Sequence, residues 1–354
     1  MKVLEIGPSP VKSKGGMATV IRGIMEDEQL NSKKIISLHE SYSDGNILYR
    51  LIFSILAFIK FIFIYNKYSI FHIHMASYGS TFRKGYYIRF LKERNKKIIL
   101  HVHGAEYLVF FDKLSDRKKD IVKNIWNSCD SVIVLSEEWK MQFEKLFNHR
   151  NIIVINNGID TQQYENGKCN IESFARNFLF LGRLGKRKGA YDVITAIHRL
   201  HKNYPDVKVY MAGDGEVEQI RNLIKQNNLD NNIKVLGWIN FEEKIELFKK
   251  ISTVLLPSYN EGLPMTLLEG MAAGKVIIST NVGGIPELVE QEKNGLIITP
   301  GDIDALCKAM EQVIEDKKFI QECSINNIDK INNEFSRRIM HSKIEKLFES
   351  VKLL

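Results

Sequence analysis

The sequence predicts an α/β protein with two doubly wound, Rossmann-like units, and three observations support this class. At 354 residues, and with roughly 100–200 residues per domain, the chain has the length of two domains. Short apolar runs alternate with helical stretches along the whole length, as in parallel sheets whose crossovers are helices. Hydrophobic residues make up 44% and charged residues 26% of the chain. That composition excludes a disordered chain, a fibrous repeat and a polytopic membrane protein.

Two series of apolar runs predict the strands. The first series is Lys2–Ile6, Ile35–Leu38, Ile70–Ile73, Ile98–His101, Ser131–Leu135 and Ile152–Ile155. The second is Phe178–Leu181, Val207–Met211, Ile233–Leu236, Thr253–Leu256, Val276–Ser279 and Leu296–Ile298. Between them, Asn156–Ser173 has turn chemistry and no apolar periodicity. We therefore expect domains at 1–165 and 166–335, followed by a last helix at about 336–354.

The positive charge is concentrated in the first half. Residues 1–165 carry 24 Lys and Arg against 17 Asp and Glu, whereas residues 166–354 carry 26 against 25. Residues 51–100 alone hold nine basic residues and one acid, Glu93. Such asymmetry is typical of a half that meets nucleic acid, a membrane surface or a phosphorylated substrate, or of a solvated basic face. The basic half lacks an aromatic strand platform or a recognition helix, which disfavours nucleic acid.

The cysteines and the N-terminus indicate a cytoplasmic protein. Cys129, Cys169, Cys307 and Cys323 are scattered, with no C-x-x-C spacing, so neither a disulfide scaffold nor a cysteine-rich zinc site is expected. The chain enters its first strand directly at Lys2, with no signal-peptide pattern.

One apolar segment, Ile47–Tyr65, leaves three alternatives open. As a helix its 19 residues span about 28 Å at about 1.5 Å per residue, which is marginal for crossing a membrane. Arg50 and Lys60 make spanning costly, and a core strand follows at Ile70. A buried helix on the flank of the sheet and a helix lying on a membrane surface are the other two readings.

A glycine loop follows the first strand. It runs from Gly7 to Gly15 and Gly16, and a helix is expected at about Ala18–Met25. Glycines at a strand-to-helix turn let backbone N–H groups approach a phosphate, although a flexible turn without a ligand has the same composition. The loop is not G-x-G-x-x-G, so a dinucleotide site is weakly supported.

A second loop follows the strand Phe178–Leu181 and is rich in cations. Arg183, Lys186, Arg187 and Lys188 lie among Gly182, Gly185 and Gly189. A planar guanidinium and a compact ammonium together suit a pyrophosphate. Ligands of such folds bind at the carboxyl ends of the parallel strands, where this loop begins.

The third segment, Pro257–Gly274, places two acids around a helix start. Pro264 suits the first position of a helix and Gly274 suits its C-terminal end. Glu261 precedes the helix and Glu269 lies inside it, beside apolar neighbours, so each carboxylate needs a partner. Sugar hydroxyls are suitable partners, and backbone N–H groups at 262–265 suit an anionic or hydroxylated ligand.

Histidines and one acidic pair complete the candidates. His103, followed by Gly104, suggests close approach to a ligand, whereas His101 is expected in the core. His74 is a weaker candidate for contact with an acceptor. Asp302-Ile-Asp304 has the D-x-D pattern of metal sites, but its position before an apolar helix predicts an N-cap, and we expect no metal site.

These motifs together resemble family 4 retaining glycosyltransferases of the GT-B fold. The resemblance covers nearly the whole chain, and the E-x7-E segment from Glu261 to Glu269 is its most specific part. The other matching motifs are Gly15-Gly16, His101-Val-His103-Gly104, Asn156-Asn-Gly-Ile-Asp160, Gly182-Arg183 to Lys188-Gly189, Ala212-Gly-Asp-Gly215 and Gly283-Gly-Ile-Pro-Glu287. Within the family, the chain looks most like bacterial enzymes of capsule, exopolysaccharide or lipopolysaccharide assembly.

The resemblance implies a role for each matching residue. Arg183 and Lys188 would bind the donor diphosphate, Glu269 the ribose, and Glu261 the donor sugar together with the segment Gly262, Leu263 and Pro264. Gly15 and Gly16 would approach the diphosphate from the other domain. His103 would lie by the reacting centre, and Trp238 and Ile239 by the base. The two domains would face a central cleft, and the last helix would pack back on the first domain.

The implied function is transfer of a hexose or N-acetylhexosamine from a nucleotide-diphosphate sugar, with UDP favoured, to a lipid-linked or oligosaccharide acceptor. No cofactor or metal is implied, because preorganised cations stabilise the leaving group. The location would be the cytoplasm or its membrane face, where an anionic membrane surface is a further partner. A nucleotide-sugar epimerase on the same fold and a non-catalytic GT-B partner subunit are the alternatives.

Overall fold

The computed structural model describes residues 1–13, 15–33, 35–167 and 171–353. Six residues lie outside this description: Lys14, Lys34, Lys168, Cys169, Asn170 and Leu354. The chain divides into an N-terminal unit, residues 1–158 with 337–354, and a C-terminal unit, residues 159–336. The boundary therefore falls after Gly158, which corrects the expected division between residues 165 and 166. The last helix belongs to the N-terminal unit.

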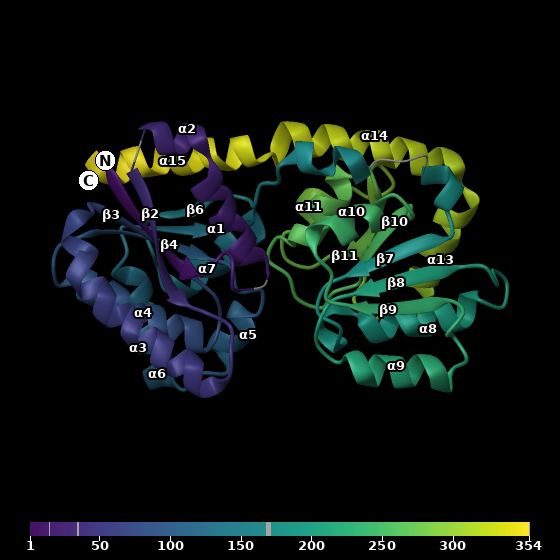
Figure 1. The fold of residues 1–354 in the computed structure, drawn as a ribbon, viewed down its shortest axis with the longest axis horizontal. Coiled ribbons are helices and arrows are strands. Elements are labelled where there is room, and N and C mark those ends of the chain that lie inside the picture. The colour runs from purple at the N-terminus through teal and green to yellow at the C-terminus, as the bar shows by residue number, and fades with distance from the viewer. Residues whose placement is uncertain (14, 34, 168–170, 354) are drawn as a thin grey trace. The chain divides into compact units, whose positions relative to one another are not determined.

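The N-terminal unit is built on a parallel six-stranded sheet with the order β2-β1-β3-β4-β5-β6 (Figure 1). Its strands are β1 Lys2–Pro8, β2 Ile35–Tyr42, β3 Ile70–Met75, β4 Lys97–Val102, β5 Ser131–Val134 and β6 Ile152–Val154. Its helices are α1 Gly16–Glu26, α2 Glu28–Lys33, α3 Ile47–Ile64, α4 Gly79–Lys92, α5 Tyr107–Asp112, α6 Asp116–Asn127, α7 Glu137–Phe147 and α15 Arg337–Leu353, with a short 3₁₀ turn η1 at Tyr65–Lys67.

Successive side chains of each strand point to opposite faces of this sheet. His39 on β2 faces α3 and α4, where its ring lies 5.6 Å from that of Phe61 and 5.8 Å from that of Tyr87. The other face is covered by α1 and α15: Phe348 of α15 lies edge-on to the ring of His72. His341 of α15 also pairs with Asp27 beside α1. The last helix is thereby part of the core of this unit.

Helix α3 is exposed along most of its length. Ala57 and Phe61 are its buried residues, and Phe61 packs edge-on against Phe71 of β3. Large apolar side chains on the rest of its surface are between 40% and 79% exposed: Ile47, Leu48, Leu51, Ile52, Ile55, Leu56, Ile59, Ile62 and Phe63. The reading of this segment as a buried flank helix is therefore wrong, because one narrow stripe suffices to dock the helix on the sheet.

By length and composition, α3 with η1 also qualifies as a candidate membrane span. The stretch Ile47–Lys67 has a mean hydropathy of 2.3 over its most apolar window, of which 11% is buried. One such helix is weak evidence of spanning. The stripe around Phe61 is docked on the unit, and β3, which follows α3 closely in the chain, pairs with both β1 and β4.

The C-terminal unit repeats the architecture with the strand order β12-β11-β10-β7-β8-β9, again all parallel. Its strands are β7 Asn177–Leu181, β8 Lys208–Ala212, β9 Ile233–Gly237, β10 Thr253–Leu256, β11 Val276–Thr280 and β12 Gly295–Ile298. Its α-helices are α8 Ala190–Leu200, α9 Val217–Gln226, α10 Phe241–Phe248, α11 Met265–Ala272, α12 Ile285–Leu288, α13 Ile303–Glu315 and α14 Lys317–Glu334. Short 3₁₀ turns are η2 Thr161–Gly167, η3 Ile171–Phe174 and η4 Lys186–Lys188.

Two layers of helices cover this second sheet. Helices α8, α9 and α13 lie on one face, and α10, α11 and α14 on the other (Figure 1). Every expected strand is present in the two sheets, within two residues of its predicted ends except for β2, which extends to Tyr42. Asp302 caps α13 by accepting a hydrogen bond from the Ala305 amide at 2.8 Å, as the N-cap reading predicts.

Candidate functional site

In the C-terminal unit, the order of the sheet reverses between β7 and β10. From β7 the chain adds β8 and β9 on one side, and it then returns to add β10, β11 and β12 on the other. Such a reversal opens a crevice at the carboxyl ends of the two strands, which is where open α/β sheets bind ligands. The loops after β7 and β10 hold the expected cation cluster and Glu261, so both lie at this point.

These loops are packed against one another through glycines. Gly189 has φ +76°, and a Cβ there would lie 2.2 Å from the carbonyl oxygen of Pro257. Gly283, with φ +55°, would place a Cβ 2.0 Å from the carbonyl oxygen of Glu261. Neither position has room for a side chain, and both have a backbone conformation that favours glycine. The glycines therefore hold the loops after β7, β10 and β11 at contact distance.

Lys188 and Glu261 form an ion pair across this crevice. The Glu261 carboxylate is 5% exposed, and its Oε1 also accepts a hydrogen bond from Ser258 Oγ at 2.7 Å. Arg187 supports the same junction, because its guanidinium donates to the Asn260 carbonyl at 3.0 Å. The pair places a cation and a hydrogen-bonding carboxylate together, and among the described residues no hydrogen bond occupies Oε2 of Glu261.

Helix α11 carries the second acid. Pro264 lies immediately before the helix as its N-cap and not in its first turn, which corrects the expected position by one residue. Gly274 follows the C-terminal end with φ +68°, and the amides of Gly274 and Lys275 bond back to Met271 and Gly270. These caps hold a helix of eight residues in place beneath the loop of Glu261.

Glu269 points from α11 to Lys244 of α10. Lys244 Nζ lies 2.7 Å from Glu269 Oε1, and both side chains are largely buried. The Lys244 ammonium also lies 5.8 Å from the centroid of the Tyr164 ring. A buried carboxylate with one oxygen paired to a cation keeps the other for a donor such as a hydroxyl.

Arg183, Trp238 and Ile239 lie at the same edge of the sheet but apart from these pairs. Arg183 is exposed, and its side chain lies beside Gly215, where a Cβ would come 2.9 Å from its Cγ. In the described part of the chain, no hydrogen bond or ion pair is found for its guanidinium. Trp238 is 51% exposed and follows β9, the edge strand beyond β8.

In the N-terminal unit, the expected residues follow β1, β3 and β4. Gly15, with φ +107°, caps α1, and Gly16 begins it. His103 is partly exposed just past β4, and its amide donates to the Met75 carbonyl at 2.8 Å. Burial, with a smaller contribution from His72, lowers the pKa of His103 to about 3, so the ring is neutral at pH 7.

The expectation that His74 contacts an acceptor is wrong. The side chain is fully buried, and both ring nitrogens are occupied: Nε2 bonds Glu5 at 2.8 Å and Nδ1 bonds His103 at 2.9 Å. Burial, followed by the neighbouring histidines, lowers the pKa of His74 well below its usual value. The residue therefore belongs to an internal network and not to a binding surface.

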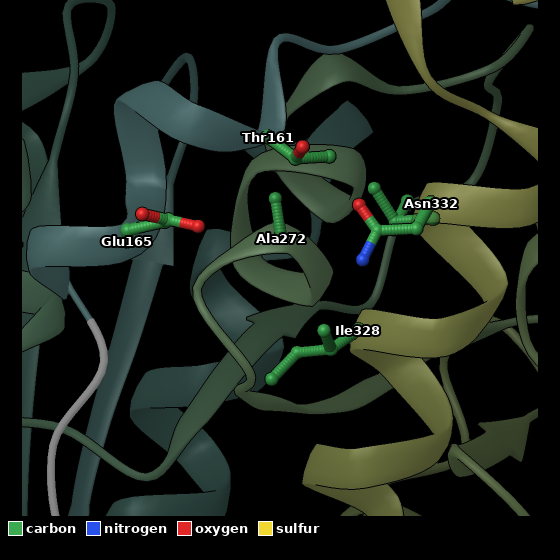
Figure 2. Close-up of a pocket in the computed structure, with 6 residues that line it drawn as sticks. Thr161, Glu165, Ala272, Ile328 and Asn332 are labelled. Carbon is green, nitrogen blue, oxygen red and sulfur yellow. The ribbon is translucent and has the colours of Figure 1, made fainter.

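A small cavity lies elsewhere in the C-terminal unit. It has a volume of about 20 Å³ and is lined by Thr161, Glu165, Ala272, Ile328, Ile331 and Asn332 (Figure 2). That is room for a single water. None of the expected site residues lines it, so it is not the candidate ligand site.

Sequence reasoning missed three polar residues. Ser258 and Lys244 supply partners to the two acids. Ser258 lies only three residues before Glu261, whereas nothing in the sequence connects Lys244 to Glu269. Glu5 is the third, and a signal existed: it is the single acid in the apolar run of β1. A carboxylate buried in a parallel sheet requires polar partners, which predicts polar side chains on the neighbouring strands.

Two doubly wound units of this kind define a GT-B protein, and solved structures agree. Sucrose-phosphate synthase from Thermosynechococcus elongatus superposes with a TM-score of 0.83 at 17% identity, covering 99% of both chains. Anabaena Alr3699/HepE, solved in complex with UDP-glucose, superposes with a TM-score of 0.78 at 20% identity, covering 99% of this chain and 100% of that one. These likenesses show the fold.

The sequence matches two glycosyltransferase families in succession. Residues 24–163 match Glycosyltransferase Family 4, and residues 167–330 match Glycosyl transferases group 1. The chain therefore belongs to the glycosyltransferases with this pair of regions. An Escherichia coli UDP-Gal:alpha-D-GlcNAc-diphosphoundecaprenol alpha-1,3-galactosyltransferase is 31% identical over 213 residues, which cover 56% of this chain and 54% of that protein. The chain spans about half the length of the curated relatives it matches first, at 47%.

Proposed function

We propose that this protein is a retaining glycosyltransferase that moves a hexose or N-acetylhexosamine from a UDP-sugar to a lipid-linked or oligosaccharide acceptor during synthesis of a surface polysaccharide. The observation that carries the proposal is the Lys188–Glu261 pair at the sheet reversal of the C-terminal unit. It combines a cation for a diphosphate with a carboxylate for sugar hydroxyls, at the edge where this fold binds ligands.

Different residues bind different parts of the donor. Arg183 and Lys188 bind the diphosphate and stabilise the negative charge that develops on the leaving nucleotide. Glu269 accepts from the ribose hydroxyls, and Glu261 from the hydroxyls of the transferred sugar. Trp238 and Ile239 contact the base. Because the cations provide the electrostatic stabilisation, the reaction needs no metal ion or other cofactor.

The N-terminal unit supplies the remaining groups. Gly15 and Gly16 let backbone N–H groups approach the phosphates, since neither carries a side chain and α1 begins there. We assign His103, whose ring is neutral, to contact with the transferred sugar. The relatives support the substrate classes: HepE was solved with UDP-glucose, and the E. coli relative is described as acting on a diphosphoundecaprenol-linked sugar.

A transfer assay tests the proposal. The protein is incubated with UDP-glucose, UDP-galactose, UDP-N-acetylglucosamine or GDP-mannose, in chelator, with and without polyprenyl-diphosphate saccharides, and the products are followed by mass spectrometry and NMR. One donor should give an α-linked product and free UDP only when acceptor is present. An isomerised donor formed without acceptor would indicate an epimerase, and no turnover of any donor would indicate a non-catalytic subunit.

We also propose that the protein works at the cytoplasmic face of a membrane, with α3 lying on an anionic lipid surface. The exposed apolar side chains of α3 provide the area for insertion. Cations line the helix and its surroundings, because Lys60 and Lys67 are exposed and Arg94 and Lys96 flank the Tyr65 ring. Apolar insertion with flanking cations is the pattern of an interfacial helix.

Vesicle flotation distinguishes binding through α3 from non-specific binding of lipid by exposed apolar side chains. The double variant Leu51→Gln/Ile55→Gln removes two side chains that are 60% and 53% exposed, and the control Ile325→Gln removes one that is 62% exposed on α14. Phosphatidylglycerol vesicles should float the wild type and the control but not the double variant, and phosphatidylcholine vesicles should float less of each. Equal flotation of all three proteins, or of none, would contradict the proposal.

A further inference from the structure

A buried network of four histidines and one glutamate lies on the face of the N-terminal sheet that α15 covers. Its members are Glu5 on β1, His72 and His74 on β3, His101 on β4 and His103 just after β4. Register explains the gathering, because Glu5 lies opposite His72, and His74 lies opposite His101. The side chains of Glu5, His72, His74 and His101 are fully buried.

The network branches at Glu5 into two arms. One arm runs from Glu5 through His72 Nδ1, at 3.1 Å, and from His72 Nε2 to His101 Nδ1, at 3.2 Å. The other runs from Glu5 Oε2 through His74 Nε2, at 2.8 Å, and from His74 Nδ1 to His103 Nε2, at 2.9 Å. The first arm ends at His101 Nε2, a buried atom for which the described residues provide no hydrogen-bond partner. The second ends at the partly exposed ring of His103.

The direction of each hydrogen bond determines which ring nitrogens carry protons in the second arm. A carboxylate oxygen only accepts, so His74 Nε2 must carry the proton and donate it to Glu5. A neutral His74 then has a lone pair on Nδ1, which must accept from His103. His103 therefore carries its proton on Nε2. Among the described residues no hydrogen bond reaches Nδ1 of His103, and in the neutral ring that nitrogen is an acceptor.

We propose that Glu5, through His74, is a positioning residue that holds His103 in its Nε2–H tautomer, so that Nδ1 accepts a hydrogen bond from a hydroxyl of the bound sugar. This inference deepens the proposed function and rests on it. It assigns His103 the role of an acceptor that orients a hydroxyl, not of a proton donor to the leaving group. The Glu5 carboxylate, separated from His103 by the single ring of His74, determines which nitrogen does so.

The alternative for such a cluster is a metal ion. One nitrogen from each of His72, His74 and His101 lies within 4.8 Å of the others. Both nitrogens of His72 and both of His74 are, however, already used by Glu5, His101 and His103. A fully buried site also lacks an entry path for an ion. Among the three histidines of this group, the hydrogen bonds from described residues leave a single ring nitrogen unused, Nε2 of His101.

A matched set of variants isolates the second arm. His74→Leu removes both the donor to Glu5 and the acceptor for His103. His74→Gln keeps them, because its amide N–H donates and its carbonyl accepts. His72→Leu is the control, since His72 is equally buried on the same strand and also bonds Glu5, but belongs to the arm that ends inside the core.

The first readout needs no activity. In protein labelled with ¹⁵N-histidine at pH 7, the ring nitrogens of His103 are assigned by their loss in His103→Gln. Wild type, His72→Leu and His74→Gln should show a protonated Nε2 and an unprotonated Nδ1, and His74→Leu should show a mixture of tautomers. A protonated Nδ1 in the wild type, an equal change in His72→Leu, or an equivalent of transition metal in the purified protein would overturn the proposal.

The second readout is kinetic and links the network to transfer. With donor saturating, kcat for transfer should fall on the order of tenfold in His74→Leu, while His74→Gln and His72→Leu remain within about threefold of wild type. If the NMR pattern holds but no protein shows transfer, the proposed function fails and the tautomer assignment stands. If transfer proceeds but kcat is the same in all variants, the positioning role is refuted.

Discussion

Lys188 on the loop after β7 forms an ion pair with Glu261 on the loop after β10, at the point where the strand order of the C-terminal sheet reverses. The pair connects two segments that are 73 residues apart in the sequence. A buried carboxylate is tolerated only where a cation or donors compensate its charge. We therefore expect the contact to stabilise the fold, in addition to the role in donor binding that we propose for it.

Removing the cation should destabilise the fold. In Lys188→Met, the buried Glu261 carboxylate keeps the hydrogen bond from Ser258 but loses its cation. We therefore expect the free energy of unfolding to fall by about 3 kcal/mol. The double variant Lys188→Met/Glu261→Gln should recover most of this loss, because no buried charge remains. Urea denaturation measures all three proteins.

An exposed ion pair provides the comparison for that result. Arg221 and Glu218 are 50% and 75% exposed, so Arg221→Ala should cost less than about 0.5 kcal/mol. A loss in Lys188→Met as small as that in Arg221→Ala, or no recovery in the double variant, would contradict the account of a buried pair.

The glycine contacts predict that two glycine-to-alanine substitutions differ in their cost to stability. Gly283→Ala places a Cβ 2.0 Å from the Glu261 carbonyl oxygen, whereas Gly237→Ala, with φ +72°, meets nothing within 4 Å. Gly237→Ala should cost about 1–2 kcal/mol for its backbone conformation alone. Gly283→Ala should cost at least about 2 kcal/mol more, because the loop of Glu261 must move. Thermal unfolding distinguishes them, and equal melting temperatures would refute the close packing of these loops.

Helix α3 should depend on one aromatic side chain for docking. Phe61 is fully buried and Phe63 is 79% exposed. Phe61→Ala should lower the free energy of unfolding by about 3–5 kcal/mol, and Phe63→Ala should change it by less than about 0.5 kcal/mol. Comparable losses in the two variants would show that α3 docks through a different face.

Mild acid should destabilise the protein through its buried histidines. Burial, followed by Lys84, lowers the pKa of His39 to about 4, and burial lowers the pKa of His74 and His101 well below the usual value. Below about pH 6.5 the unfolded chain binds protons that the folded chain does not, so stability falls as the pH decreases. Each such group contributes up to about 1.4 kcal/mol per pH unit.

Urea denaturation between about pH 7.5 and about pH 6 measures this slope, above the range in which most carboxylates titrate. His39→Gln removes one of the groups and should reduce the slope without abolishing it. Stability that is constant or rises on acidification would show that these rings are protonated in the folded protein.

The sheets were predictable because their signal is local. A strand such as Thr253–Leu256 is a continuous apolar run, and burial on both faces of a parallel sheet requires such runs. The cation cluster around Lys188 and the acids Glu261 and Glu269 were predictable for a related reason. Each combines a glycine or proline turn with charged residues at a strand end, and that combination specifies both the local backbone and the chemistry.

What the sequence could not predict depends on contacts between distant segments. Lys244 lies on an amphipathic helix like other exposed lysines, and only the packing of α10 beside α11 brings it to Glu269. The exposure of α3 could not be predicted either, because an apolar helix has the same composition whether its surroundings are protein or lipid. His74 was assigned to the wrong role since its partner Glu5 is 69 residues away.

The most direct test of the central claim is calorimetric titration of UDP into the chelator-treated protein. Arg183→Ala removes an exposed cation at the sheet reversal, and Arg176→Ala removes an exposed one paired with Asp206 at the opposite end of β7. We predict that wild type and Arg176→Ala bind UDP alike, and that Arg183→Ala binds it at least about tenfold more weakly, a loss of about 1.4 kcal/mol, with an unchanged melting temperature. Equal affinity in Arg183→Ala and wild type, or no binding of UDP to any of the three, would contradict a nucleotide-diphosphate site at this end of the C-terminal sheet.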